Sequence, residues 1–481
     1  MKSMQKPTKT LISTAVLTLL TGVTAHAGGF SLYTESNGYS VGNFGAGVAA
    51  EAKDASTTWY NPAGLALIRD EQIVFGGVGV FPKADLTGTS SFNFTNPLTG
   101  TVFRFPSSYN NLSVGRDAFV PSGYFAMPLG ENATFGIGLL APFGLATEVG
   151  RSQALRYAAT FSELLTFNLT PAIGGKVTEN LSVGAGIDLQ YSKVKFNSIL
   201  GNPVLGSLQP PTFSPLQFDS LSYNKGQSTA VGFHAGVLGM FNDNHTRIGL
   251  NYQSKMKHKF NGYSRLSGPL AGPTGVIPTT VWNTNLTSNR IEFPEVVTLS
   301  AYQDVHPRVA LLGSVVYTGW HVLRNIQLNN VVLGSPGGFA TPPAPSQPFI
   351  ANSTSTENYD NVWRFAIGAN VKVNEKALIR FGGGYDATPT QNRFRTVRLP
   401  DADRWALSIG GHYQANPNFG IDLGYTYLWA DSDPTINKTT AAGAASTFTV
   451  NARGDVNAHL AGIQLNWKTD MVSKTIKKVH V

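Results

Sequence analysis

The stretch Leu181-Ser-Val-Gly-Ala-Gly-Ile-Asp-Leu-Gln-Tyr191 decides the fold class. Its apolar side chains fall on every second residue, and the residues between them are serine, glycine, aspartate and glutamine. Strict alternation with period two predicts a β-strand with one apolar and one polar face. A strand of about 9–11 residues is long enough to cross a bilayer when tilted, and an aromatic residue at its end is typical of the membrane interface.

The same alternation recurs in the segments 363–373, 404–413, 421–429 and 461–468, and several of them carry Trp or Tyr near their ends. A soluble β-sandwich also alternates, but its strands average about 5–6 residues and need no aromatic ends. We therefore expect an all-β protein that forms a transmembrane antiparallel β-barrel. Charged residues on the polar face would then point into the barrel, because hydrocarbon excludes them. They are Arg364, Lys372, Arg380 and Arg404.

The composition agrees with a membrane barrel. Charged residues make up 13% of the 481 positions, about half the usual share of a soluble domain, and there are 51 glycines. The chain has no cysteine, which excludes disulfides, thiolate nucleophiles and Cys-ligated zinc. The mature chain contains no run of eighteen apolar residues, so a helical membrane protein is excluded as well.

The net charge of +8 is concentrated at the two ends of the chain. Lys2, Lys6 and Lys9 precede the apolar run 11–23, which is followed by Ala25-His26-Ala27. This pattern predicts a secretory signal peptide over residues 1–27. A second basic group begins at Lys468, and we expect residues 470–481 to form a basic tail. The body between the ends is nearly neutral, so nucleic acid is not expected as a partner.

Long connections rich in Pro, Ser, Thr and Asn alternate with short turns, and we expect the long ones to be extracellular loops at about 197–228, 261–290, 325–360 and 431–450. The first of these loops combines apolar side chains with four prolines and almost no charge. Exposed apolar residues at that density are typical of a binding surface. The predicted capture residues are Leu205, Leu208, Phe213, Leu216 and Phe218.

Residues 28–70 do not alternate and are rich in Gly, Ala, Ser and Asn. A barrel of many strands has a lumen that its own side chains cannot fill, so water or a plug must occupy it. We expect residues 28–70 to form an N-terminal hatch that plugs a barrel built from residues 71–469.

Several motifs carry a resemblance to a known family. They are Gly28-Gly29-Phe30, Asn61-Pro62-Ala63, Phe143–Glu148, Phe293–Glu295, Thr318–Trp320, Pro389–Arg393 and Leu399–Trp405. With these motifs the mature chain resembles the FadL/TodX family of bacterial outer-membrane long-chain fatty acid transporters. The resemblance implies a barrel of about fourteen strands, an N-terminal hatch and a place in the bacterial outer membrane.

The resemblance also implies a route for the substrate. An amphipathic molecule is first captured between the loops at about 197–228 and 260–291. It then binds against the hatch, at positions that correspond to Phe30, Asn61, Pro62 and Ala63. A hatch rearrangement lets it leave sideways, through a kinked strand, into the membrane. Such an exit suits an acyl chain, because each CH₂ gains about 0.8 kcal/mol by staying in apolar surroundings.

The nature of the ligand stays open at this point. In the family, basic side chains meet the substrate carboxylate, but the corresponding stretches 196–198 and 356–360 contain no Arg or Lys. We favour a long-chain fatty acid and keep aromatic or other hydrophobic compounds as the alternative. An open diffusion porin and a surface adhesin are weaker alternatives. We expect a monomer that is surrounded by outer-membrane lipid and lipopolysaccharide.

Two motifs could suggest an enzyme. Gly38–Gly42 fits the G-x-S-x-G pattern of a serine hydrolase, but that motif needs a strand, a sharp turn and a helix, and no parallel-sheet pattern precedes Ser40. Gly45–Ala50 resembles a dinucleotide fingerprint without the βαβ unit that gives the fingerprint its meaning. The histidines are scattered, with no pair at metal-ligand spacing. We therefore expect no enzymatic activity, no cofactor and no metal.

Overall fold

The computed structural model describes residues 29–95, 99–201, 218–271, 281–334, 349–443 and 446–469. The predicted signal peptide (1–27) and basic tail (470–481) lie outside the described residues. So do four of the five predicted capture residues, Leu205, Leu208, Phe213 and Leu216.

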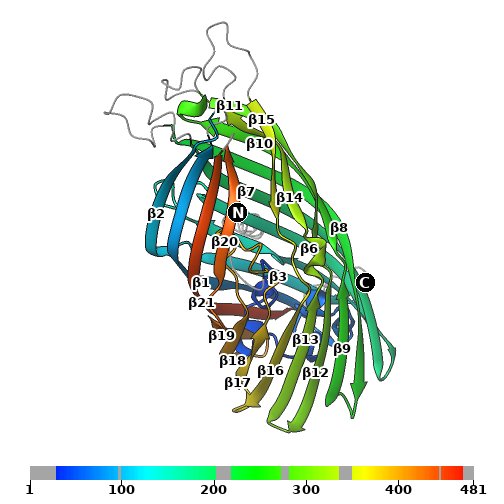
Figure 1. The fold of residues 1–481 in the computed structure, drawn as a ribbon. Coiled ribbons are helices and arrows are strands. Elements are labelled where there is room, and N and C mark those ends of the chain that lie inside the picture. Colours follow the sequence, from blue (N-terminus) through cyan, green and yellow to red (C-terminus); the bar gives the residue numbers. More distant parts are fainter. Residues whose placement is uncertain are drawn as a thin grey trace, which may run out of the picture.

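Fourteen antiparallel strands form a closed ring (Figure 1). Each strand pairs with the next along the chain, and the last pairs with β1 to close the wall, as the sequence predicted. The ring strands are β1 (Glu71–Thr95), β3 (Ala118–Pro128), β4 (Ala133–Leu140), β6 (Phe161–Thr178), β7 (Leu181–Leu200), β8 (Ser220–Phe241), β9 (Thr246–Gln253), β12 (Val296–His306), β13 (Val309–Thr318), β16 (Val362–Lys372), β17 (Ala377–Asp386), β18 (Arg404–Asn416), β19 (Phe419–Ala430) and β21 (Ser446–Thr469).

Seven further strands extend the wall at one end, which we call the loop end; the opposite end, with short turns such as 242–245 and 373–376, is the turn end. The seven are β2 (Val102–Ser113), β5 (Gly144–Glu148), β10 (Met256–Ser267), β11 (Val281–Phe293), β14 (Asn325–Gly334), β15 (Phe349–Thr356) and β20 (Thr435–Gly443). Much of the sequence expected to be loop is therefore strand. The alternation is hidden there because Thr, Asn and Ser occupy both faces outside the lipid, as in β11.

The outer surface of the ring is apolar. Ile367, Val231 and Leu407 have exposed fractions of 74%, 68% and 66%, whereas the polar residues between such positions point inward. An apolar belt of this extent belongs in lipid rather than water. Trp363, Trp405 and Trp429 stand exposed toward the loop-end side of their strands, as in an interfacial girdle. No helix in the described ranges is long and apolar enough to span a bilayer.

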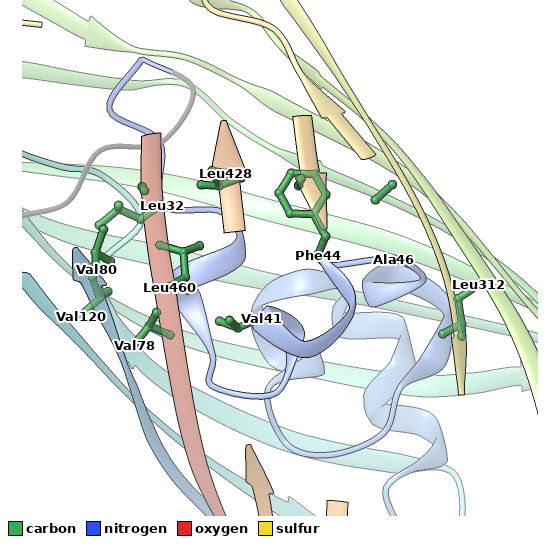
Figure 2. Close-up of a cluster of buried hydrophobic side chains, with 14 of the residues drawn as sticks. Leu32, Val41, Phe44, Ala46, Val78, Val80, Val120, Leu312, Leu428 and Leu460 are labelled. Carbon is green, nitrogen blue, oxygen red and sulfur yellow. The ribbon is translucent and has the colours of Figure 1, made fainter. Parts of the chain in front are cut away.

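The segment from residue 29 to residue 68, here called the hatch, fills the lumen (dark blue in Figure 1). Its short helices are η1 (Thr34–Ser36), η2 (Ser40–Asn43), α2 (Val48–Glu51), α3 (Thr57–Tyr60) and η3 (Pro62–Leu67); two more, η4 (Pro269–Ala271) and η5 (Trp320–Val322), lie between wall strands. Figure 2 shows Leu32, Val41 and Phe44 of the hatch beside side chains of β1, β13, β19 and β21. The hatch is thus packed directly on the wall.

Inward-facing glycines allow this close packing. A Cβ atom at Gly249 of β9 would overlap the carbonyl oxygen of Ala49, and one at Gly174 of β6 would overlap that of Pro62. A Cβ at Gly410 of β18 would lie 2.7 Å from the Gly42 Cα atom. Only glycine lets two backbones approach so closely. This explains part of the high glycine content.

Candidate functional site

Phe30 is the centre of an aromatic cluster below the loop end of the barrel. Its ring centroid lies 4.5 Å from that of Trp320, 5.8 Å from Phe293 and 6.2 Å from Phe143, and the rings meet edge to face. Tyr359 is the fourth neighbour, with its ring 6.3 Å away. Phe30 itself is only 6% exposed. The aromatic pocket is therefore filled by the hatch.

The neighbours of Phe30 come from the motifs that carry the family resemblance. Phe143, Phe293 and Trp320 each belong to a different motif, and a fourth motif contributes Asp401. The Gly29 N–H donates to Asp401 Oδ2 at 2.7 Å, and Gly29 has a φ of +70°, which favours glycine. Motifs that are far apart in the sequence thus meet at the start of the hatch.

The wall is interrupted beside Phe30. The β3–β4 ladder runs only from Gly123 and Leu139 to Pro128 and Thr134, and β5, beyond the break at 141–143, pairs with β6 instead. The Leu32 N–H donates to the Pro142 carbonyl, and the Gly144 N–H donates to the Phe30 carbonyl, both at 2.9 Å. Residues 30–32 of the hatch therefore pair with residues 142–144 as a short strand and complete the wall at the interruption. Figure 2 shows Leu32 near Val80 of β1 and Val120 of β3.

Asn61, the second part of the predicted site, holds the hatch to itself and to the wall. Its Nδ2 donates to the carbonyl oxygens of Ala49, at 2.7 Å, and of Val237 in β8, at 3.1 Å. Its Oδ1 accepts the Ala63 N–H at 3.1 Å and caps η3, which starts with Pro62.

The structure places the two parts of the predicted site in different clusters. Ala63 packs with Leu238 and Met240 on β8, whereas Phe30 packs with the aromatic residues. We infer that the Asn61–Ala63 turn is an anchor for the hatch rather than a lining of the Phe30 pocket.

Charged side chains also join hatch and wall. Arg364, Arg380 and Arg404 are buried and point inward as expected, and Lys372, on the same face of β16 as Arg364, is exposed at the turn end of the lumen. Arg380 binds Asp422 at 2.7 Å, and Lys53 of the hatch contacts the same carboxylate. Arg364 donates to Thr34 and to the Phe44 carbonyl.

One buried carboxyl group of the hatch stands apart. Neither oxygen of Glu35 has a hydrogen-bond partner among the described residues. Burial raises the pKa of Glu35 to about 7, although the nearby Arg364 and Arg404 act to lower it. A carboxyl group in this state is poised to change charge near neutral pH.

In the structure, a basic side chain lies beside each of the stretches 196–198 and 356–360, which contain no Arg or Lys themselves. Arg398 lies over the Phe196 ring at 5.6 Å and donates to the Asn197 carbonyl at 3.3 Å. Lys438 of β20 donates to the Thr356 carbonyl at 3.3 Å. Both stretches expected to lack a basic partner therefore have one, because residues distant in the sequence reach them. The basic run 393–398, which joins the motifs Pro389–Arg393 and Leu399–Trp405, was the available signal.

Arg398 is the more unusual of the two cations. It hydrogen-bonds to carbonyl and hydroxyl oxygens, including Ser162 Oγ at 2.8 Å and the Ala158 carbonyl at 3.0 Å, and no described carboxylate forms an ion pair with it. Burial lowers its pKa to about 10, which still leaves it charged at neutral pH. Its neighbour Val397 belongs to a second apolar cluster, which includes Leu86, Phe92 and Tyr157, and Leu399 belongs to the Phe30 cluster.

A small cavity adjoins the Phe30 cluster. Tyr33, Phe143, Gln190 and Met256 are among its lining residues, and its volume is about 20 Å³. That is space for a water molecule and not for an acyl chain. A substrate can enter this region only if the start of the hatch moves.

Two further predicted positions have structural surroundings. Phe218, the one described residue of the predicted capture set, is buried beside Asp219. Asp219 binds Arg156 at 2.8 Å and the Tyr157 hydroxyl at 2.7 Å, so this part of the stretch is tied to the barrel. Ser40 of the G-x-S-x-G pattern is fully buried in η2 and donates to the Thr34 carbonyl at 2.6 Å, which is a structural role.

Comparison with known proteins identifies the family. A profile described as outer membrane protein transport protein (OMPP1/FadL/TodX) matches residues 18–468. Outer membrane protein P1 of Haemophilus influenzae is 28% identical over 493 residues, which cover 96% of this chain and all of that protein. A long-chain fatty acid transport protein of Escherichia coli is 27% identical over 478 residues and is covered to 99%, with 96% of this chain.

Solved structures share the fold. A Pseudomonas aeruginosa FadL homologue has a TM-score of 0.74 at 21% identity, with 92% of this chain and 100% of that chain covered. The Ralstonia pickettii toluene transporter TbuX has a TM-score of 0.59 at 20% identity, covering 90% and 98%. Members of this family are transporters of hydrophobic compounds. The chain belongs to the OMPP1/FadL/TodX family of outer-membrane transport proteins.

Proposed function

We propose that the protein takes up long-chain fatty acids across the outer membrane, with the Phe30 cluster as the buried site and the wall interruption at 141–143 as the lateral exit. The observation that carries the fatty acid assignment is Arg398. A partly buried guanidinium without a carboxylate partner, between two apolar clusters, suits a ligand that is apolar along its length and acidic at one end.

The route follows from the contacts of the hatch. Phe30 occupies the aromatic pocket and, through its carbonyl, holds Gly144 of the kinked strand. An acyl chain that displaces Phe30 therefore removes the same contacts that complete the wall. Filling the inner site and opening the exit become one event, and the chain never needs to enter water.

Arg398→Gln tests the assignment. A hydrogen bond to a charged group contributes about 1.5–3 kcal/mol, so we expect binding of oleate to weaken by roughly 10–100-fold. Binding of oleyl alcohol should change little, because it offers no carboxylate. The matched control is Arg393→Gln, which removes the same charge from an exposed side chain five residues earlier.

The competing functions give different results in these assays. Equal loss of oleate and oleyl alcohol binding in Arg398→Gln would contradict a carboxylate site. Saturable uptake of toluene, with none of oleate, would favour the aromatic hydrocarbon alternative, for which the rings around Phe30 would be suitable. Large ion conductance in planar bilayers would favour a porin, and an adhesin would tolerate Phe30→Ala without any change in uptake.

A further inference from the structure

Cations gather on the outer surface of one side of the barrel. The group, here called the basic patch, consists of outward-facing residues on β7, β8, β10 and β11. On β10 the exposed Lys257 and Lys259 alternate with buried Met256, His258 and Phe260, which shows that these lysines point away from the lumen. The basic patch comprises Lys193, Lys195, Lys225, Lys257, Lys259 and Arg290.

Strand register sets like charges side by side. Lys195 pairs with Lys225 across β7 and β8, and Lys259 pairs with Arg290 across β10 and β11. Like charges directly opposite each other destabilise a sheet.

Only part of this charge is neutralised by the protein. Glu163 lies 3.0 Å from both Lys193 and Lys195, and Glu292 lies 3.8 Å from Lys257. Among the described residues, no carboxylate forms an ion pair with Lys225, Lys259 or Arg290. The patch therefore holds unneutralised positive charge, which an external anion would relieve.

The patch borders a groove in the outer wall. The β8–β10 ladder stops at Gln227 and Asn261, and the β8–β9 ladder begins only at His234 and Gln253. The interval leaves an open groove of about 640 Å³, whose lining includes Tyr191, Thr229, Lys257, Lys259 and Arg290. Basic side chains and one tyrosine thus surround a hollow large enough for a lipid head group.

The height of the patch matches the head-group layer. Toward the turn end, beyond Tyr191, Gln227 and Thr229, the outward side chains are Leu189, Val231 and Phe233, which are apolar and 45%, 68% and 53% exposed. The cations therefore lie on the loop-end side of this lipid-facing belt. In outer-membrane barrels the short turns are periplasmic and the longer connections extracellular, so the patch faces the outer leaflet.

The opposite side of the barrel differs in charge. There Lys83 is held by Asp455 at 2.5 Å and Arg453 by Asp433 at 2.6 Å, and Asp85 and Asp431 add further negative charge. A surplus of cations is therefore a property of one side and not of the whole girdle.

We propose that the basic patch binds the phosphate groups of lipopolysaccharide, with the phosphorylated head group at the groove and the acyl chains along the apolar belt below it. The charge, the groove and the height together favour a phosphorylated glycolipid of the outer leaflet. This inference rests on the outer-membrane location and not on what the channel transports.

The test is lipid counting by native mass spectrometry on the full protein in detergent with added phosphorylated rough lipopolysaccharide. The variant Lys257→Gln/Lys259→Gln/Arg290→Gln should bind about 100-fold more weakly, since each cation near an anionic lipid surface contributes about a factor of five. The control Lys83→Gln/Arg453→Gln removes two cations from the opposite side and should bind as the wild type does. Lys257→Arg/Lys259→Arg keeps the charge and should retain binding.

Several results would overturn the proposal. One is unchanged lipopolysaccharide binding by the triple variant, with its heat-modifiable gel band showing that it is folded. Another is a loss of binding in the opposite-side control as large as in the triple variant. A third is binding of dephosphorylated lipopolysaccharide as tight as that of the phosphorylated form. Displacement of the lipid by millimolar inorganic phosphate would point to a site for free phosphate instead. Fatty acid uptake is measured separately, so failure here leaves the proposed function intact, and failure of uptake leaves this binding result intact.

Discussion

Glu35→Gln tests how stably the hatch is held in the lumen, which we call the seating of the hatch. Glu35 is 1% exposed, and its carboxyl oxygens have no hydrogen-bond partner among the described residues. Burial raises its pKa from 4.5 to about 7; Asp386 adds to the increase, while Arg364 and Arg404 oppose it. A glutamine resembles the protonated acid in shape and cannot ionise, so the substitution removes only the cost of the buried charge.

The sign and size of the effect follow from this pKa. A carboxyl group whose pKa is raised in the seated hatch costs nothing below pH 4.5, where it is protonated in both states. The cost grows as the pH rises from 4.5 to 7 and is constant above. The difference of 2.5 pKa units, at 1.36 kcal/mol each, amounts to about 3 kcal/mol at pH 8. The wild-type hatch should therefore be less firmly seated at pH 8 than at pH 5.

Hydrogen exchange of hatch peptides, followed by mass spectrometry in lipid nanodiscs, measures the seating. At pH 8 Glu35→Gln should slow exchange of the hatch by up to about 100-fold relative to the wild type, and at pH 5 by far less. Comparison of variant and wild type at one pH cancels the chemical pH dependence of exchange. The exposed Glu131→Gln is the control. The reasoning would be refuted if the hatch exchanged equally fast in Glu35→Gln and the wild type at both pH values, or faster in the variant at pH 8.

Three other substitutions probe the same assembly. Phe30→Ala removes a buried ring, a change that typically costs about 3–5 kcal/mol, and should reduce saturable uptake while raising non-saturable leakage of hydrophobic dyes; unchanged uptake would exclude a role for the aromatic pocket. Asn61→Ala leaves the Val237 carbonyl without its side-chain donor and should speed exchange across η3, with barrel strands unaffected. Gly410→Ala places a methyl group 2.7 Å from the Gly42 Cα atom and should destabilise the packing of the hatch by roughly 1–3 kcal/mol. The control Gly411→Ala, whose Cβ meets only the Leu378 carbonyl at 3.4 Å, should not. Similar hydrogen exchange of the hatch in the two variants would contradict the close packing.

The barrel strands could be predicted from the sequence where they face lipid, because apolar residues then alternate with polar ones. The alternation at 363–373 corresponds to β16, and the one at 181–191 forms part of β7, which continues to Leu200. Beyond the lipid the outward residues become polar, so the period-two signal fades while the strand goes on. This is why β20 lies within a stretch expected to be a loop, and why β10 and β11 extend into another such stretch.

The site was only partly accessible. Phe30 could be chosen from the family motif, but its placement away from Asn61 depends on the path of the hatch through the lumen. Arg398 approaches Asn197, 201 positions away, and no local pattern encodes such a contact. The wall interruption depends on pairing between three separate segments. Alternation predicts strands, and family motifs predict candidate site residues. Contacts between segments that are distant in the sequence can be seen only in the structure.

The seating of the hatch has a consequence for biogenesis. Asp54 accepts a hydrogen bond from Gln464 of β21, 410 residues later in the chain, and Lys53 contacts Asp422 of β19. The hatch precedes every wall strand in the sequence, yet its binding surface exists only after the last strands have joined the ring. Contacts of such long range form late, because the intervening chain must be ordered first. We therefore expect residues 29–68 to be the last part of the chain to take their place, and until then the lumen lacks the segment that fills it.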